Sequence, residues 1–282
     1  MNDPTVGPSH DGAGPSGSAV VIDGVSKQFT VHGRTSQALV DVALDAPRGE
    51  ITSLVGPSGC GKSTVLNLIA GTIEPETGSV RHNGAPVVAI NHDVAYLPQG
   101  DDLFPWRTVM DNVALPLELR RVSRAARHRQ AREILALFGL AGRESSYPAQ
   151  LSGGMRKRVQ IARALLSGVD TLLMDEPFGA LDAQLKVRMQ IDLLERVHRQ
   201  TGNTILFVTH DLAEAVALGD RVVVFSPGPG HVIHVENIDD LGDRSDLLSL
   251  TESPEFQRHV RTLWSLVAPE LVHRSAASGA TP

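Results

Sequence analysis

The chain has 282 residues, of which 41% are hydrophobic and 21% are charged, which is ordinary composition for one large globular domain or two small ones. Its net charge of −6 argues against a non-specific nucleic-acid binder, because phosphate backbones favour proteins with surplus Lys and Arg. The single cysteine, Cys60, excludes an internal disulfide, and no apolar run approaches the roughly 20 residues that cross a bilayer. No positively charged start followed by an apolar run marks a secretory signal, so we expect a cytoplasmic protein whose membrane role is at most peripheral.

The two ends of the chain differ in composition from the rest. Residues 1–18 are rich in Gly, Pro and Ser and nearly devoid of large apolar side chains, which predicts a disordered tail. Residues 273–282 predict a flexible tail for the same reason. Between them, in residues 19–272, short apolar runs alternate with helical stretches, which is typical of an α/β domain with a mostly parallel sheet. The expected strands are residues 51–55, 171–174, 204–208 and 222–225, and the first expected helix is residues 62–70.

One internal segment has a different texture. Residues 109–147 are rich in Ala, Arg, Leu and Glu, and apolar side chains recur at helical spacing at positions 131, 134, 135 and 138. This pattern predicts a helical subdomain, at about residues 100–160, inserted into the α/β domain. The segment after about residue 235 is weakly patterned and is expected to end in a helix around residues 256–267.

A glycine-rich loop follows the first expected strand and fits the pattern G-x-x-x-x-G-K-[ST] before a helix. Its glycines allow backbone N–H groups to surround a phosphate chain at a helix N-terminus, whose dipole favours anions. Lys62 is then expected to bridge the β- and γ-phosphates of a nucleotide, and Ser63 to ligate Mg²⁺. The alternative is a flexible Gly/Ser turn, and Cys60 is interpreted as a bystander. The expected phosphate contacts are Gly56, Pro57, Ser58, Gly59, Cys60, Gly61, Lys62, Ser63 and Thr64.

Two adjacent carboxylates follow the apolar run at residues 171–174. Asp175 and Glu176 stand at the end of a strand, which is where α/β proteins bind their ligands. Asp175 is suited to a Mg²⁺ shell, and Glu176 can take a proton from water near a γ-phosphate. Alone, such a pair is more often a solvated helix cap, and the phosphate loop upstream favours the functional interpretation. His210 also follows a strand and could contact the γ-phosphate, although most histidines are surface or satisfied core residues.

A second glycine-rich helix start has the sequence LSGGM, at residues 151–155, before an Arg-rich helical run. It offers another place for an anion but has no lysine of its own. At this point the chain resembles the ATP-binding-cassette proteins, whose LSGGQ signature it matches at four of five positions. Met155 replaces the usual Gln. Because the backbone amides and Ser152 are expected to contact phosphate, that change puts little in doubt.

The resemblance runs from about residue 19 to residue 231, with the family's motifs in order. It implies an α/β fold: a P-loop NTPase core with a mostly parallel sheet, an inserted α-helical subdomain and an N-terminal antiparallel β part. It also implies an ATPase that uses ATP and Mg²⁺, with Phe29 stacked on adenine and Gln99 sensing Mg²⁺ and the attacking water. Taken singly, Phe29 is rather a core aromatic and Gln99 a surface amide. The implied catalytic set is Glu176, His210, Lys62 and Gln99, and the implied metal set is Ser63, Gln99 and Asp175.

In this family two cassettes associate head to tail, so the resemblance implies a homodimer in which the signature of one chain closes over ATP on the other. The residues that would act across that interface are Ser152, Gly153, Gly154 and Asp182. The resemblance also implies a peripheral position on the cytoplasmic face of the membrane, on integral permease subunits, with an extracytoplasmic solute-binding protein as an indirect partner and no nucleic acid. Phe104 and Trp106 could form a groove for the permease or could simply pack the helical subdomain.

Two stretches, residues 104–119 and 209–230, look like those of bacterial importers for nitrate, sulfonate, taurine and related solutes. The expected function is therefore to couple ATP-driven dimer closure and reopening to solute uptake through a separate permease. A cassette of a lipid or lipoprotein exporter is an alternative. A non-transport scaffold cassette is a weaker one, because ribosomal cassette proteins usually carry two cassettes per chain and this chain has one set of motifs.

Overall fold

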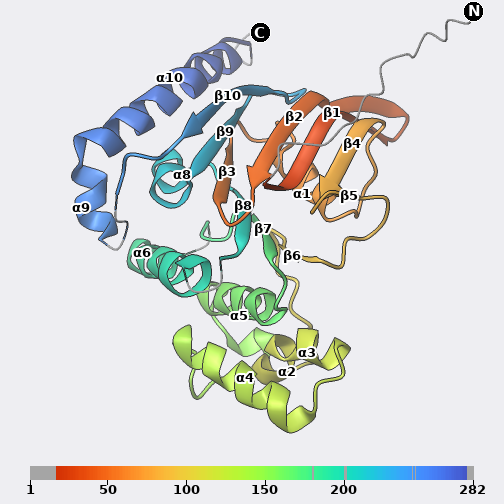
Figure 1. Cartoon of the computed structure of the whole chain (residues 1–282), viewed down its shortest axis with the longest axis vertical. Coiled ribbons are helices and arrows are strands. Elements are labelled where there is room, and N and C mark those ends of the chain that lie inside the picture. Colours follow the sequence, from red (N-terminus) through yellow and green to blue (C-terminus); the bar gives the residue numbers. More distant parts are fainter. Residues whose placement is uncertain (1–16, 180, 200–201, 243, 245, 278–282) are drawn as a thin grey trace, which may run out of the picture.

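The computed structural model describes residues 17–179, 181–199, 202–242, 244 and 246–277. Most of the expected N-terminal tail, residues 1–16, lies outside the described residues, and the first strand begins at Ser18. Within the described ranges, no helix combines the length and apolar character that a membrane span requires. Two sheets occupy the upper part of Figure 1, a group of short helices lies at its lower end, and the C-terminal helices run along one side.

The first sheet is antiparallel, with the strand order β2-β1-β4-β5. Its first two strands meet in a two-residue turn, where His32 and Gly33 have φ values of 50° and 76°. Two successive positive φ values are typical of a tight hairpin turn whose twist suits the strands. The sheet confirms the expected N-terminal antiparallel part. Its strands are β1 (Ser18–Val31), β2 (Arg34–Pro47), β4 (Thr77–His82) and β5 (Ala85–Pro86).

The second sheet has the order β10-β9-β3-β8-β7-β6, and only β10 runs antiparallel to its neighbour. Every residue of β3, β7 and β8 is buried, as continuous apolar runs predict for strands covered on both faces. The mostly parallel sheet is thus confirmed. β6 is short and β10 alternates half-buried with exposed positions, so neither was expected. The strands are β3 (Ile51–Val55), β6 (Val94–Leu97), β7 (Thr171–Asp175), β8 (Thr204–Val208), β9 (Arg221–Phe225) and β10 (Val232–Asn237).

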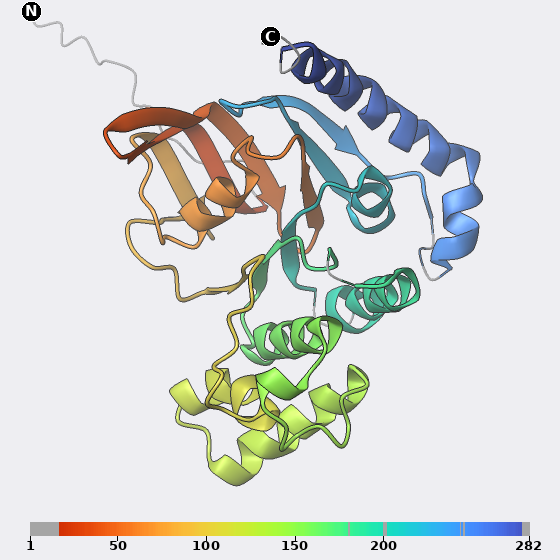
Figure 2. The ribbon, with the colours of Figure 1, turned by 180° about the vertical axis from the view of Figure 1, so that it is seen from behind.

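The helices form three groups around these sheets. One helix, α1, contacts both sheets and lies between them, as the view from behind also shows (Figure 2). The inserted helical subdomain consists of α2, α3 and α4, which contact α5, and it projects away from the sheets (Figure 1). The bounds are α1 (Lys62–Ile69), α2 (Val109–Val113), α3 (Leu115–Leu119), α4 (Arg124–Leu137), a 3-10 turn (Pro148–Gln150), α5 (Gly153–Leu166), α6 (Ala183–Asp192), a π-helical turn (Leu193–His198), α8 (Leu212–Leu218), α9 (Leu247–Glu252) and α10 (Pro254–Ala277).

The C-terminal helix is longer than expected. The predicted helix around residues 256–267 is present, but α10 continues to Ala277, so residues 273–277 of the expected flexible tail are helical. Residues 274–277 are Arg, Ser, Ala and Ala, which a helix can accommodate, and composition alone could not place the end. Its buried side chains Phe256 and Leu263 join the core cluster on the α5 and α8 side of the second sheet.

Candidate active site

Four loops that carry predicted residues leave neighbouring strands of the parallel sheet. The phosphate loop follows β3, His210 follows β8, Glu176 follows β7 and Gln99 follows β6. In the order β3-β8-β7-β6 these strands are adjacent and parallel, so their carboxyl ends meet at one edge. That edge is where open α/β sheets bind ligands, and it positions the site.

The phosphate loop requires glycine at two positions because of close approaches. Gly56 has a φ of 149°, and a Cβ on it would lie 2.8 Å from the carbonyl oxygen of Phe225. Gly61, the N-cap of α1, has a φ of 98°, and a Cβ there would lie 2.5 Å from Leu39 Cδ2. Both conformations are ones that side-chain-bearing residues rarely adopt. The loop is therefore tightly curved and packs against β2 and β9.

Lys62 lies across this curl. Its Nζ donates hydrogen bonds of 2.8 Å to the Gly56 carbonyl and 3.0 Å to the Pro57 carbonyl. Cys60 is fully buried in the core, with its Sγ 3.6 Å from the Lys62 Nζ. The thiol is therefore buried beside the ammonium group, which the two loop carbonyls hold in place.

A cleft of about 480 Å³ opens over the loop. Phe29 forms part of its wall, is 40% exposed, and lies under Lys27, whose Nζ is 5.6 Å from the ring centroid. An accessible aromatic ring at this place is not a core residue, and it offers a flat apolar surface. Gly56, Pro57 and Cys60 do not line the cleft. The lining residues are Phe29, Ala38, Ser58, Gly59, Gly61, Lys62, Ser63, Thr64, Gln99, Glu176 and Val208.

Asp175 ends β7 beneath this cleft and is 4% exposed. Burial raises the pKa of its carboxyl and neighbouring Glu176 raises it further, while a hydrogen bond from Ser63 and the charge of Lys157 act in the opposite direction. The Ser63 hydroxyl and the Asp175 carboxylate are oxygen donors. Mg²⁺ in nucleotide sites is bound by one or two such protein groups together with phosphate oxygens and water, so this pair fits the ion.

Glu176 brings three of the predicted catalytic residues together. Its Oε2 accepts a 2.8 Å hydrogen bond from Gln99 Nε2, and its Oε1 lies 3.4 Å from His210 Nδ1. The residue has a φ of 48°, which is uncommon for a side-chain-bearing residue, and its N–H donates to the Val208 carbonyl at 3.0 Å. Left-handed backbone at a non-glycine residue costs on the order of 1–3 kcal/mol and is concentrated at functional sites. The turn thus aims the carboxylate at the cleft.

The signature residues and Asp182 lie elsewhere. Ser152 caps α5 by accepting a 3.3 Å hydrogen bond from Met155 N, and Asp182 caps α6 by accepting a 2.9 Å hydrogen bond from Leu185 N. None of Ser152, Gly153, Gly154 and Asp182 is among the described residues that line the cleft. Asp175 and His210 do not line it either, but they contact the lining residues Ser63 and Glu176. The structure therefore divides the predicted residues into two groups within one chain.

Two residues of α5 that the sequence did not single out hold the Gln99 segment. Lys157 Nζ donates to the Pro98 carbonyl at 3.1 Å, and Gln160 Nε2 donates to the Gly100 carbonyl at 3.0 Å. Burial lowers the pKa of Lys157, while nearby Asp102 and Asp175 act to raise it. The available signal was their spacing of three residues on a helix with an otherwise apolar buried side. Both side chains are buried, so the helix that follows the signature also supports the catalytic loop.

Several known proteins are similar to this chain over most of its length. The family model described as "ABC transporter" matches residues 39–179. Taurine import ATP-binding protein TauB of Chromobacterium violaceum is 45% identical, covering 77% of this chain and 82% of the relative. TauB of Rhizobium johnstonii is 42% identical, covering 80% and 87%. An uncharacterized ABC transporter ATP-binding protein of Methanocaldococcus jannaschii, MJ0412, is 41% identical, covering 77% and 81%.

Solved structures show the same fold. The dimeric structure of MJ0796, a bacterial ABC transporter cassette, has a TM-score of 0.71 and 32% identity, and covers 78% of this chain and 98% of that one. A second structure of MJ0796 is a dimeric post-hydrolysis state bound to ADP and Pi, with the same scores. The chain belongs to the ABC transporter family. It is an ATP-binding subunit of such a transporter and has ATPase activity. Within that family it is similar to proteins named as taurine import ATP-binding proteins.

Proposed function

We propose that this chain, at the cytoplasmic face of the membrane, powers the import of a small solute of the nitrate, sulfonate or taurine kind through a separate permease. The relatives named for taurine import support the solute class. The observation that carries the mechanism is the division of the predicted residues: one group surrounds the cleft, and the signature group does not reach it. A second copy is the natural source of the missing group, because both sets are present in every chain.

In this proposal Phe29 stacks on adenine and the phosphate loop holds the triphosphate. Lys62 exchanges its carbonyl partners at Gly56 and Pro57 for phosphate oxygens, which attract an ammonium group more strongly. Ser63, Asp175 and Gln99 would hold Mg²⁺. When bound, the ion neutralises charge on the phosphates.

Glu176 is the proposed base. Its carboxylate orients a water molecule and accepts its proton as the water oxygen bonds to the γ-phosphorus and the bond to ADP breaks. Gln99 and His210 already contact the two carboxylate oxygens, so they fix its direction toward the cleft. His210 is then placed to stabilise charge on the transferred phosphoryl group.

The signature completes the site across the interface. Ser152, the N–H groups at the start of α5 and Asp182 would approach the nucleotide of the second chain, where the helix dipole favours phosphate. ATP then joins two copies, and loss of the γ-phosphate releases them. This opening and closing is the movement that a permease can use.

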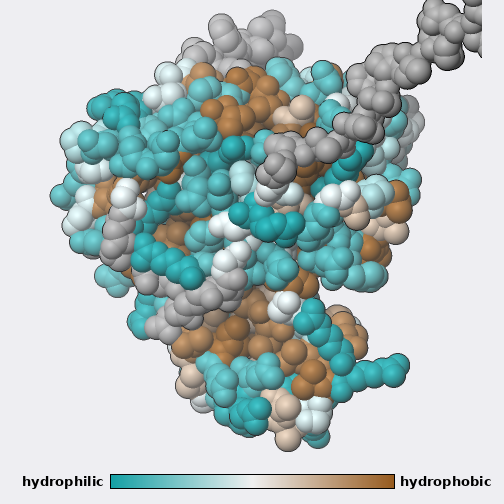
Figure 3. Space-filling view, viewed as in Figure 1, coloured by the Kyte–Doolittle hydropathy of each residue, from teal (hydrophilic) through white to brown (hydrophobic). Residues whose placement is uncertain are grey.

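The segment after Gln99 supports a permease contact. Trp106 is 71% exposed and its ring centroid lies 5.3 Å from that of Phe104, so it does not pack the helical subdomain. Brown, apolar side chains gather over α5 and the helical subdomain in the space-filling view (Figure 3). The exposed ring of Trp106, beside the half-buried ring of Phe104, fits an apolar partner helix.

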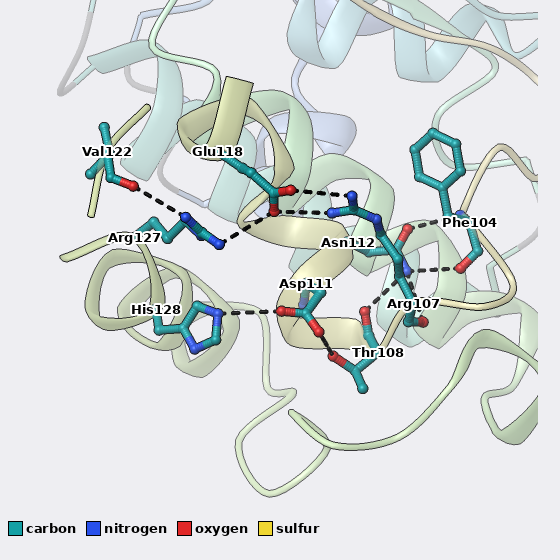
Figure 4. Close-up of polar contacts among 9 residues, drawn as sticks. All are labelled: Phe104, Arg107, Thr108, Asp111, Asn112, Glu118, Val122, Arg127 and His128. Carbon is teal, nitrogen blue, oxygen red and sulfur yellow. Dashed lines mark hydrogen bonds and ion pairs between the residues drawn. The ribbon is translucent and has the colours of Figure 1, made fainter. Parts of the chain in front are cut away.

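The backbone on both sides of Trp106 is held by the buried Asn112, whose contacts with Phe104 and Arg107 are drawn in Figure 4. Asn112 accepts a 2.8 Å hydrogen bond from Phe104 N and donates to the carbonyls of Phe104, Arg107 and Thr108 at 3.0–3.1 Å. Arg107 also pairs with Glu118 at 3.1 Å. The segment is therefore rigid before any partner binds, which lowers the entropy lost on docking.

Purification of the chain with its membrane subunit, followed by reconstitution in vesicles with a solute-binding protein, tests the proposal. Taurine or a related sulfonate should stimulate ATP hydrolysis, and Trp106→Ala should abolish stimulation while the isolated subunit hydrolyses ATP at the unchanged rate. Arg221→Met, at the start of β9, is the control. A co-purifying exporter subunit, or hydrolysis indifferent to every such solute, would refute the import assignment.

A further inference from the structure

A cluster of charged side chains joins α6 to the loop that carries His210, and the proposed hydrolysis does not use it. Lys186 Nζ lies 2.8 Å from Asp211 Oδ2 and 3.1 Å from Glu214 Oε2. The Glu214 carboxylate also accepts a 2.8 Å hydrogen bond from Thr209 Oγ1. The cluster thus connects the second turn of α6 with residues on both sides of His210.

The burial of Glu214 makes the charge of Lys186 important. Glu214 is 6% exposed, and burial raises the pKa of its carboxyl although Lys186 and Thr209 act to lower it. Burial also acts to lower the pKa of Lys186, but the hydrogen bond to Asp211 and the charge of Glu214 outweigh it and the pKa is raised. A buried carboxylate without its cation is strongly unfavourable, so the loop would rearrange if Lys186 lost its charge.

The same end of α6 contacts the signature. A Cβ on Gly154 would lie 3.2 Å from Leu185 Cδ2 and 3.3 Å from Leu181 Cδ2, so these leucines pack closely against the start of α5. Asp182 caps α6 between them. Helices α5 and α6 lie side by side in both ribbon views (Figure 1 and Figure 2). The first turns of α6 therefore touch the signature on one side and the His210 loop on the other.

We propose that Lys186 is a positioning residue that couples the two nucleotide-contacting edges of one chain. When the signature closes on the nucleotide of the second copy, Leu181 and Leu185 shift with it, and the charged cluster carries the shift to the His210 loop. The 3.4 Å contact between His210 and Glu176 then depends on whether the signature is engaged. This inference rests on the proposed function, because it needs a nucleotide at each edge.

The test compares two losses of an ion pair. Lys186→Met keeps the aliphatic stem and removes the charge. Arg221→Met is the matched control. Arg221, on β9, pairs with Asp45 of β2 at 3.0 Å, and its side chain is 21% exposed, against 24% for that of Lys186. Lys186→Met should bind ATP with unchanged affinity, because the phosphate loop keeps its contacts, but should turn over about 10- to 100-fold more slowly, as a small misplacement of a catalytic group produces.

Cooperativity separates this role from a merely structural one. The dependence of the rate on ATP concentration should be cooperative in the unchanged protein and in Arg221→Met, but non-cooperative in Lys186→Met. Lys186→Arg, which restores the charge, should recover both rate and cooperativity. Equal rate and cooperativity in Lys186→Met and Arg221→Met would overturn the inference, as would weakened ATP binding in Lys186→Met.

A second variant keeps the inference testable if Lys186→Met does not fold. Glu214→Gln retains an acceptor for Thr209 and removes the charge that attracts Lys186, and it should show the same slow, non-cooperative turnover with normal ATP binding. Normal turnover in that variant would overturn the inference. If the unchanged protein itself shows no ATP hydrolysis, the proposed function fails instead, so the two failures are distinguishable.

Discussion

Helices α1 and α5 both begin at glycine-rich segments, yet Gly61 and Gly153 occupy these segments for different structural reasons. At α1, Gly61 has a positive φ, and a Cβ on it would lie 2.5 Å from the Leu39 side chain. The fold itself therefore requires glycine at this position. At α5, Gly153 has no unusual φ, and the nearest atom to its ideal Cβ position is 4.0 Å away, in Arg156. A glycine for which the chain's own fold has no use indicates a close approach by something else. In the proposed dimer that is the phosphate chain held by the second copy.

The largest expected effect comes from Glu176→Gln, which leaves both helix starts intact. Turnover should fall by roughly 10²–10⁴-fold, the usual contribution of a general base, while Mg-ATP still binds. The trapped nucleotide should convert the monomer into a dimer on size-exclusion chromatography. Adding Gly153→Asp to this variant should preserve ATP binding and abolish the dimer. Dimerisation of the double variant would show that α5 does not contact the nucleotide.

Gly61→Ala tests the first helix start. The strained φ and the clash with Leu39 should lower the free energy of unfolding by about 1–3 kcal/mol and weaken ATP binding. Chemical denaturation and a nucleotide-binding titration measure the two effects. Gly59→Ala serves as a control for strain alone, since Gly59 has a φ of 80° but nothing within 4 Å of its Cβ position. Equal losses in the two variants would show that the close approach is unimportant.

Asp175→Asn should stabilise the subunit in the absence of nucleotide. The pKa of Asp175 in the folded protein is raised above the ordinary Asp value of 3.8, so the folded protein holds this proton more tightly than the unfolded chain. Stability is therefore lost as pH rises from 3.8 through the raised pKa. Asn carries no charge at any pH and avoids this loss. The free energy of unfolding at pH 7 should therefore rise by about 0.5–2 kcal/mol, the usual size of a single stabilising substitution. The gain should shrink below pH 3.8. Thermal denaturation against pH measures it, and a variant no more stable at pH 7 than the unchanged chain would contradict the prediction.

The smallest change in stability is expected for Gly153→Ala. Because the added methyl group meets nothing closer than the Arg156 side chain at 4.0 Å and Ala favours a helix, the free energy of unfolding should change by less than about 0.5 kcal/mol. Hydrolysis should nevertheless slow, because in the proposed dimer the methyl group would face the second copy's nucleotide. Denaturation curves and steady-state rates report the two quantities separately. A destabilised variant with normal hydrolysis would reverse the contrast between the helix starts.

Much of the first group of site residues could be predicted from local sequence. The phosphate loop, the carboxylate pair and His210 each directly follow an apolar run, and the runs at β3, β7 and β8 are fully buried strands. A continuous apolar run bounded by glycine or charge is a local signal, so no partner strand is needed to recognise it. Gln99 follows a short, half-buried strand, and only the order of the motifs singled it out.

The amino-acid sequence by itself determined the buried parallel strands, the glycine-rich helix starts and the carboxylates that follow β7, because these depend on local composition and spacing. Tertiary structure decided which strand ends are neighbours, and hence that Gln99, Glu176 and His210 touch while Ser152 and Asp182 stay apart from them. It also decided which polar side chains are buried, such as Lys157 and Glu214. Strand order and burial arise from contacts between distant segments, and a single sequence carries no local record of them.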